Sequence, residues 1–168
     1  MLKKARVIPI YKNGDKDDPG NYRPISVLPT LSKIFERHIA TQIQSFFEKT
    51  NIIHKTQSGF RKNHSCNTAL VRLIDTWMKA VDEGKLVGTV FLDLKKAFDL
   101  VDHQILLYKL KLYHFSETSL KLFHSYLSNR TQTVKLGNLQ SEFLPVKSGV
   151  PQGSILGPLL FLIYINDI

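Results

Sequence analysis

The sequence predicts an α+β domain with helices packed on one face of a mostly antiparallel sheet. The first observation is the order of segments, which runs strand, helix, helix, strand, two helices, hairpin and helix, with no linker between them. The second is composition: hydrophobic residues make up 43% of the 168 residues and charged residues 22%, as in ordinary globular chains. A chain of this length suits one domain with a proper core.

The first part of the chain predicts a strand, a loop and a helix. Residues 5–11 are apolar and β-branched, which favours a short strand, and residues 12–21 hold the turn formers and charges of a mobile surface loop. Pro29 and Thr30 indicate a helix start with Thr30 as the N-cap. The apolar face of this helix is predicted from residues at helical spacing: Leu31, Ile34, Phe35, Ile39, Ile43, Phe46 and Phe47.

The second part begins with another amphipathic helix, predicted over residues 67–82 and ended by Gly84. Residues 87–94 form a compact apolar run, rich in Val, Thr and Phe, that predicts a buried strand ending near Asp93. The remaining predicted elements are helices near 103–113 and 116–127, a hairpin of 131–136 with 142–146 around Gly137 and Asn138, a tight loop at 148–153 and an apolar helix from Ser154.

The balance of charge favours a polyanionic partner. The chain carries 23 Lys and Arg against 14 Asp and Glu, a formal net charge of +9. Such a surplus attracts nucleic acid because each neutralised phosphate releases counterions, although an inert basic surface has the same charge. The single cysteine, Cys66, excludes an internal disulfide. No signal peptide is recognisable and the apolar stretch 159–165 is too short to span a membrane, so we expect an intracellular protein without a membrane partner.

Asp93 is the first candidate for chemistry. A carboxylate at the end of a buried strand costs free energy unless something compensates its charge. A divalent metal is one compensation, because Mg²⁺ accepts carboxylate oxygens and keeps waters and phosphate oxygens in its other positions. An isolated aspartate at such a place more often caps the next turn, and Asp99 and Asp102 allow the same interpretation.

A second candidate is the loop at residues 148–154. Gly149 and Gly153 allow the backbone to approach a ligand, Pro151 stiffens the turn, and Gln152 presents a neutral donor and acceptor. The helix that follows would direct its positive N-terminal end toward the same space, which suits phosphate. The residue types alone are equally consistent with a Gly/Pro turn that precedes a helix and binds no ligand.

Four segments occur in an order that resembles one family. They are Asn-Tyr-Arg-Pro-Ile-Ser at 21–26, Gln-Ser-Gly-Phe-Arg at 57–61, Phe-Leu-Asp-Leu-Lys-Lys-Ala-Phe-Asp at 91–99 and Gly-Val-Pro-Gln-Gly-Ser at 149–154. Together they resemble the reverse transcriptases of non-LTR, LINE-like retrotransposons over nearly the whole chain. The resemblance implies a partial right-hand polymerase fold. Residues 1–85 would form the fingers with palm-flanking helices, and residues 86–168 a truncated palm.

The resemblance also implies a metal site. Asp93 would be the catalytic, metal-binding aspartate of the palm, and Leu94 would offer its backbone carbonyl to the same metal. The implied metal is Mg²⁺, with Mn²⁺ as the alternative. In this family a strand-turn-strand with an aromatic-Ala-Asp-Asp sequence follows the segment that corresponds to 166–168. With Asp93 alone the two-metal site is half built, so we expect this chain by itself to be inactive.

The nucleotide site implied by the resemblance involves further residues. Lys12 and Arg23 would grip the triphosphate of a dNTP. Ala97 and the backbone of residues 95–97 would line the triphosphate pocket, and Leu94 would also belong to the nucleotide site. Phe98 would lie under the incoming sugar and exclude a ribose 2′-hydroxyl, while Gln152 would contact the incoming nucleotide and its template pair.

The implied activity is RNA-directed DNA synthesis, in which dNTPs are added to the 3′-hydroxyl of a DNA primer on an RNA template. An endonuclease domain elsewhere in the parent polyprotein is compatible with this assignment. The alternative is a non-catalytic nucleic-acid-binding remnant that keeps the basic charge. A continuation of the reading frame into an Ala-Asp-Asp strand would favour the polymerase.

Overall fold

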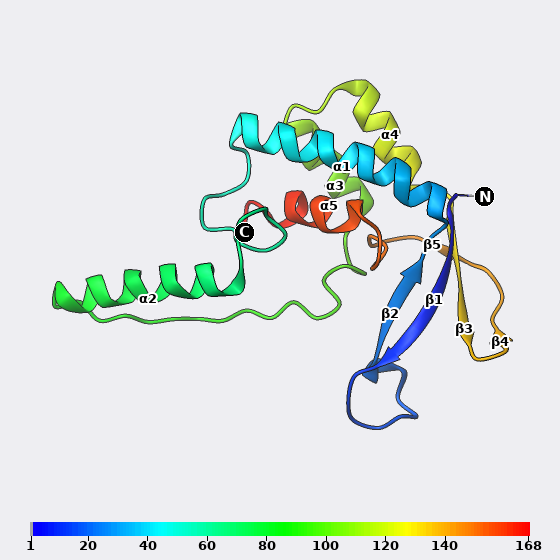
Figure 1. The fold of residues 1–168 in the computed structure, drawn as a ribbon, viewed down its shortest axis with the longest axis horizontal. Coiled ribbons are helices and arrows are strands. Elements are labelled where there is room, and N and C mark those ends of the chain that lie inside the picture. The colour runs from blue at the N-terminus through cyan, green and yellow to red at the C-terminus, as the bar shows by residue number, and fades with distance from the viewer. Residues whose placement is uncertain (1) are drawn as a thin grey trace.

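The sheet forms one end of the molecule in a computed structural model that describes residues 2–168 (Figure 1). Its strands are β1 (Lys4–Tyr11), β2 (Tyr22–Val27), β3 (Arg130–Leu136), β4 (Leu139–Gln140) and β5 (Leu144–Val146). β1 lies between β2, which is antiparallel to it, and β3, which is parallel to it, and β3 also pairs antiparallel with β4 and β5. The expected mostly antiparallel sheet is confirmed.

The helices group beyond one end of this sheet. They are α1 (Thr30–Thr50), α2 (Cys66–Asp82), α3 (His103–Leu112), α4 (Glu117–Leu127) and α5 (Leu156–Ile165), with a short 3₁₀ helix η1 (Pro19–Asn21). In Figure 1, α1, α3, α4 and α5 lie together, whereas α2 reaches away from them. Within residues 2–168, no helix has both the length and the apolar character needed to cross a membrane.

Helix α5 is the centre of the hydrophobic core. It is apolar all round its circumference, which is the pattern of a helix enclosed by other elements. Helices α1 and α3 pack against it, and α4 packs against α3. Its buried side chains meet those of the surrounding helices in one cluster that includes Ile43, Leu106, Leu110, Phe123, Leu127, Leu160 and Ile163.

Local capping explains why three helices begin where they do. Asp102 accepts hydrogen bonds from the amides of Gln104 and Ile105 at the start of α3. Ser116 caps α4 in the same way, and Ser65 forms a reciprocal capping box at the start of α2. These signals are local in sequence, which is why these helices were predictable.

Helix α1 departs from prediction at its start. Thr30 is its first helical residue rather than its N-cap, and Pro29 stands at the cap without a side-chain hydrogen bond. The apolar residues of the first turns, Leu31, Ile34 and Phe35, are exposed. The buried face of α1 begins instead with two polar residues, and it consists of Ser32, Glu36, Ile39, Ala40, Ile43 and Phe47.

The buried strand predicted at residues 87–94 is wrong for this structure. The segment is extended but belongs to no sheet, and Val90, Phe91 and Leu92 are at least 80% exposed. A strand needs neighbouring backbone to bond its amides and carbonyls, and no described strand pairs with this segment. Helix α2, which precedes it, likewise buries no residue. Figure 1 shows α2 reaching away from the other helices and the segment after it running back alongside α2.

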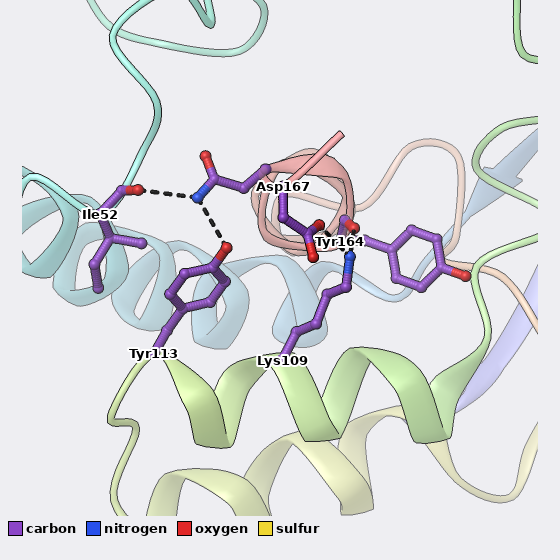
Figure 2. A network of polar contacts seen from close by, with 6 residues as sticks. Ile52, Lys109, Tyr113, Tyr164 and Asp167 are labelled. Atoms are coloured by element: carbon purple, nitrogen blue, oxygen red, sulfur yellow. Dashed lines mark hydrogen bonds and ion pairs between the residues drawn. The ribbon is translucent and has the colours of Figure 1, made fainter.

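Asn166 ties the end of α5 to two other parts of the chain (Figure 2). Its Nδ2 donates to the backbone carbonyl of Ile52 at 2.9 Å and to the hydroxyl of Tyr113 at 3.0 Å. Its Oδ1 accepts from the backbone amide of His54 at 2.8 Å. The amide therefore joins α5 to the segment after α1 and to the end of α3.

Lys109 of α3 supplies a positive charge at the same end of α5 (Figure 2). Its Nζ donates to the backbone carbonyl of Tyr164 at 2.5 Å and pairs with the carboxylate of Asp167. A cation at the C-terminal end of a helix is favourable because it meets the negative end of the dipole. The hydrogen bond from Lys109 lowers the pKa of Asp167.

We expect Asn166→Ala to lower the free energy of unfolding by about 1–3 kcal/mol, because three partners of its amide lose their hydrogen bonds. The measurement is urea unfolding at equilibrium, with comparison of midpoints at equal slope. Asn138→Ala is the matched control, because Asn138 is exposed in the turn between β3 and β4. The free energy of unfolding of this control should stay within about 0.5 kcal/mol of that of the parent chain. Equal stability of the two variants would contradict the anchoring role of Asn166.

Candidate functional site

A cleft of about 890 Å³ lies between the far end of the β1–β2 pair and the segment after residue 92. Most of its charged lining is basic, and the cations are Lys12, Lys16, Arg23, Lys95 and Lys96. The carboxylates that line it are Asp17, Asp93 and Asp99. A cleft lined with cations beside a few carboxylates suits a phosphate-bearing ligand that is bound together with a divalent metal.

The structure brings together most of the residues that the sequence singled out. Lys12, Arg23, Asp93, Leu94 and Gln152 all line the cleft, although they come from distant parts of the chain. The cleft lining also includes residues that sequence reasoning did not assign to a site. The charged ones among these are Lys16, Asp17 and Asp99.

Hydrogen bonds shape the loop that carries Lys12 and Lys16. The hydroxyl of Tyr11 donates to the carbonyl of Gly14 at 2.6 Å, and that of Tyr22 donates to the carbonyl of Lys16 at 2.8 Å. The two tyrosine rings lie 5.6 Å apart. The loop between β1 and β2 is therefore folded back on the strand ends, which keeps its lysines at the cleft.

Asp93 and Leu94 are the residues that could contact a metal. Both are exposed, and no hydrogen bond or ion pair joins the Asp93 carboxylate to another described residue. Its oxygens and the Leu94 carbonyl are hard donors that fit a divalent cation such as Mg²⁺. Between residues 2 and 168, no three His, Cys, Asp or Glu side chains gather as a metal site. Two such donors would fill only part of the coordination sphere of Mg²⁺.

Gln152 is held by two neighbours. Its Nε2 donates to Oδ1 of Asp99 at 3.0 Å, and its backbone carbonyl accepts from the amide of Ser26 in β2 at 2.7 Å. Asp99 was not assigned a role from sequence, although it is the last residue of the 91–99 segment. The structure gives it one, because it orients the amide of Gln152.

The glycines of the 148–154 loop face protein backbone rather than a ligand. Gly153 has a φ of +113°, and a Cβ there would lie 2.6 Å from the carbonyl oxygen of Ser26. Gly149 has a φ of +86°, and a Cβ there would lie 2.7 Å from the carbonyl oxygen of Asp99. The sequence predicts that these glycines let the backbone approach a ligand, and in the structure their close neighbours are β2 and the turn that ends at Asp99.

The N-terminal end of α5 also has a different partner from the one expected. The backbone amide of Ile155 donates to Oε2 of Glu36 at 2.7 Å, and Ser154 Oγ accepts from the amide of Gly157 at 2.8 Å. Glu36 is buried. This helix end is therefore directed into the protein and is not available to a phosphate, contrary to the sequence prediction.

Phe98 and Ala97 are not part of the cleft lining. The Phe98 ring stacks on Phe161 of α5, with centroids 4.7 Å apart and planes at 22°, and meets the edge of Phe60 at 5.8 Å. Phe98 and Ala97 are both half-buried against the core cluster. The role of Phe98 as a sugar gate stays a prediction, and in this structure its ring belongs to an aromatic stack.

The sequence of this chain matches a known protein family. Residues 10–168 match the family model described as reverse transcriptase (RNA-dependent DNA polymerase), so the chain belongs to that family. Members of the family generally use divalent metal ions.

Curated relatives include polymerases of insect mobile elements. The chain is 40% identical over 159 residues to a probable RNA-directed DNA polymerase from transposon X-element of Drosophila melanogaster, covering 94% of this chain and 17% of the relative. It is 37% identical over 166 residues to the RNA-directed DNA polymerase from mobile element jockey of the same species, covering 98% and 18%. The chain thus spans less than a fifth of the length of these relatives.

A solved structure has the same fold. An apo telomerase from Candida tropicalis, truncated from its C-terminal domain, superposes with a TM-score of 0.64 and 16% sequence identity. The match covers 97% of this chain and 38% of the telomerase chain. The α+β class and the partial polymerase fold expected from sequence are therefore confirmed.

We expect Gly153→Ala to destabilise the chain by about 2–4 kcal/mol, because it combines a strained φ with a backbone clash. Gly137→Ala is the matched control, since Gly137 also has a positive φ but a Cβ added there would have no other atom within 4 Å. The free energy of unfolding of that control should fall by only about 1–2 kcal/mol. Thermal and urea unfolding of both variants give the difference. A smaller loss at Gly153 than at Gly137 would refute the close packing of the loop on β2.

Proposed function

We propose that this chain is the nucleotide-binding part of an RNA-directed DNA polymerase of a non-LTR retrotransposon. In the parent enzyme, the 3′-hydroxyl of a DNA primer on an RNA template would attack the α-phosphate of a dNTP, and pyrophosphate would leave. One observation carries the proposal: Lys12, Arg23, Asp93 and Gln152 come from separate segments and line one cleft. Catalysis would rest on alignment and charge stabilisation.

The residues of the cleft have distinct roles in this proposal. Arg23 and Lys12 hold the triphosphate, the first with a planar fork of donors and the second with a point charge. Gln152, oriented by Asp99, contacts the nucleotide and its template pair. Ala97 reaches the triphosphate pocket only through its backbone, because its side chain packs toward the core.

Mg²⁺ is the proposed metal, with Mn²⁺ as the alternative. The Asp93 carboxylate and the Leu94 carbonyl would hold it, together with phosphate oxygens and water. When bound, the metal supplies positive charge that stabilises the attacking and leaving oxygens. The remaining carboxylates of a two-metal site would come from outside residues 2–168.

We assign residues 1–85 to the fingers with palm-flanking helices and residues 86–168 to the palm. The exposed apolar side chains of 90–92 support this division, because a palm strand is covered on its faces by other parts of the domain. An endonuclease domain elsewhere in the parent polyprotein and an intracellular location are further predictions.

A non-catalytic nucleic-acid-binding remnant is the second candidate. It is favoured by the net charge of +9 together with the lack of a cluster of metal-binding side chains in the described part of the chain. Such a remnant would bind RNA or DNA through its basic surface and would gain nothing from Asp93.

The decisive test measures dNTP incorporation on a primed RNA template with Mg²⁺. We expect no incorporation by this chain alone, and activity in the parent enzyme that Asp93→Asn reduces at least about a hundredfold, because a metal ligand is lost. Asp75→Asn is the control, since Asp75 is an exposed aspartate on α2 outside the cleft, and it should keep full activity. Extension by this chain alone, or full activity of Asp93→Asn, would count against the proposal.

Phe98 is tested by sugar selection in the parent enzyme. If its ring closes the floor of the sugar pocket, Phe98→Val opens space for a 2′-hydroxyl, and the specificity constant for ribonucleotides should rise relative to that for deoxyribonucleotides. Phe123→Val, at a buried position in α4, controls for general loss of core packing and should leave the ratio unchanged. An unchanged ratio in folded Phe98→Val would assign Phe98 to the aromatic stack alone, where truncation to Ala costs about 3–5 kcal/mol.

A further inference from the structure

The carboxylate of Glu36 in α1 has no part in the function proposed above, yet it is one of the most enclosed groups in the molecule. The residue is 1% exposed. A charged group is rarely buried so completely unless hydrogen bonds compensate the loss of water. Both of its oxygens are engaged: Oε2 accepts from the amide of Ile155 at 2.7 Å, and Oε1 accepts from the hydroxyl of Tyr126 at 3.1 Å.

The contact with Ile155 adds a distant partner to the start of α5, where the hydroxyl of Ser154 already accepts from the amide of Gly157. Ile155 is the N-cap residue of α5, and its side chain makes no capping hydrogen bond. The carboxylate of Glu36 lies at this end, where the helix dipole is positive, so charge and hydrogen bonding both favour the contact. A residue of α1 therefore satisfies one amide at this helix end, and Ser154 satisfies another locally.

The remaining contacts show that this carboxylate is built into the core. Burial raises the pKa of the Tyr126 hydroxyl, and the charge of Glu36 raises it further, so the hydroxyl remains a donor. Arg130 is also buried, donates to the backbone carbonyl of Tyr126 at 3.1 Å and lies 4.9 Å from its ring. Glu36, Tyr126 and Arg130 thus link α1, α4, β3 and the start of α5.

A short turn connects this network to the cleft. Gln152 lies three residues before Ile155, within a tight turn. The turn is held by two hydrogen bonds to the carbonyl of Pro151, from the amide of Ser154 at 3.1 Å and from its hydroxyl at 2.9 Å. On the cleft side, Gln152 is tied to Asp99 and Ser26. The turn thus provides a short connection between the start of α5 and Gln152.

We propose that Glu36 is a positioning residue for nucleotide binding, because it holds the start of α5 and, through the turn at 151–154, sets the orientation of Gln152 toward the cleft. The inference rests on the proposed role of Gln152. Loss of Glu36 should weaken nucleotide binding more than the chemical step, since it disturbs a binding contact and leaves Asp93 untouched.

The test uses the parent enzyme and two measurements: hydrogen exchange of the backbone at 148–156, and KM and kcat for dNTP incorporation. Glu36→Ala should speed exchange in this loop about tenfold or more and raise the KM for dNTP several-fold with a smaller change in kcat. Glu36→Gln keeps an oxygen for the Ile155 amide and should restore most of both properties. Leu110→Ala, at a buried position in α3, controls for general destabilisation. It should change neither the exchange rate of the loop nor the KM for dNTP.

The outcomes separate the two levels of the proposal. Unchanged loop exchange in Glu36→Ala and in Glu36→Gln would overturn the role of Glu36, whatever the activity. Faster exchange with an unchanged KM would restrict Glu36 to stability and also overturn the proposal. Gln152→Ala with an unchanged KM would remove Gln152 from the nucleotide site, and the positioning role would fall with it. If Glu36→Ala does not fold, Glu36→Met, which keeps most of the side-chain volume but removes both acceptor oxygens, decides by the same two measurements. Loop exchange and KM equal to those of Glu36→Gln would then overturn the proposal.

Discussion

The loop from residue 148 to residue 155 lies directly against two other backbone segments, with no side chain between them. The Ser26 carbonyl faces Gly153 and the Asp99 carbonyl faces Gly149, each at a distance that excludes a Cβ. The β2 strand and the turn that ends at Asp99 are therefore fixed to the same loop, and with them the opposite walls of the cleft. The position of Gln152 follows from this close packing, because its neighbours on both sides are held.

The other end of the same loop connects the cleft to the helical core. The buried carboxylate of Glu36 faces the start of α5, while Asn166 and Lys109 hold the end of that helix. Helix α5 thus has polar anchors at both ends and apolar contacts along its length. Rigid support of this kind gives a binding residue a defined geometry without requiring that the residue itself be buried.

Features with local causes were predictable from the sequence. The capped helices α3 and α4 and the hairpin of β3 with β4 and β5 depend on residues close in sequence. Arg23, Asp93 and Gln152, which the ordered motifs single out, line one cleft, and their role in nucleotide binding stays a prediction. Features with distant causes were not. Residues 87–94 have the composition of a strand but lack a pairing partner among the described residues. A glutamate in an amphipathic helix is normally exposed to solvent. Glu36 is buried only because α1 packs on α5.

The parallel pairing of β1 with β3 has a consequence for synthesis on the ribosome. Lys4 pairs with Thr131, so β1 leaves the ribosome long before one of its two neighbouring strands. Until then β1 has only β2 beside it, and a two-stranded hairpin is marginally stable in water. The wall of the cleft that carries Lys12 and Arg23 is therefore completed late. Its assembly depends on a contact between distant parts of the sequence, which is the kind of contact that slows folding.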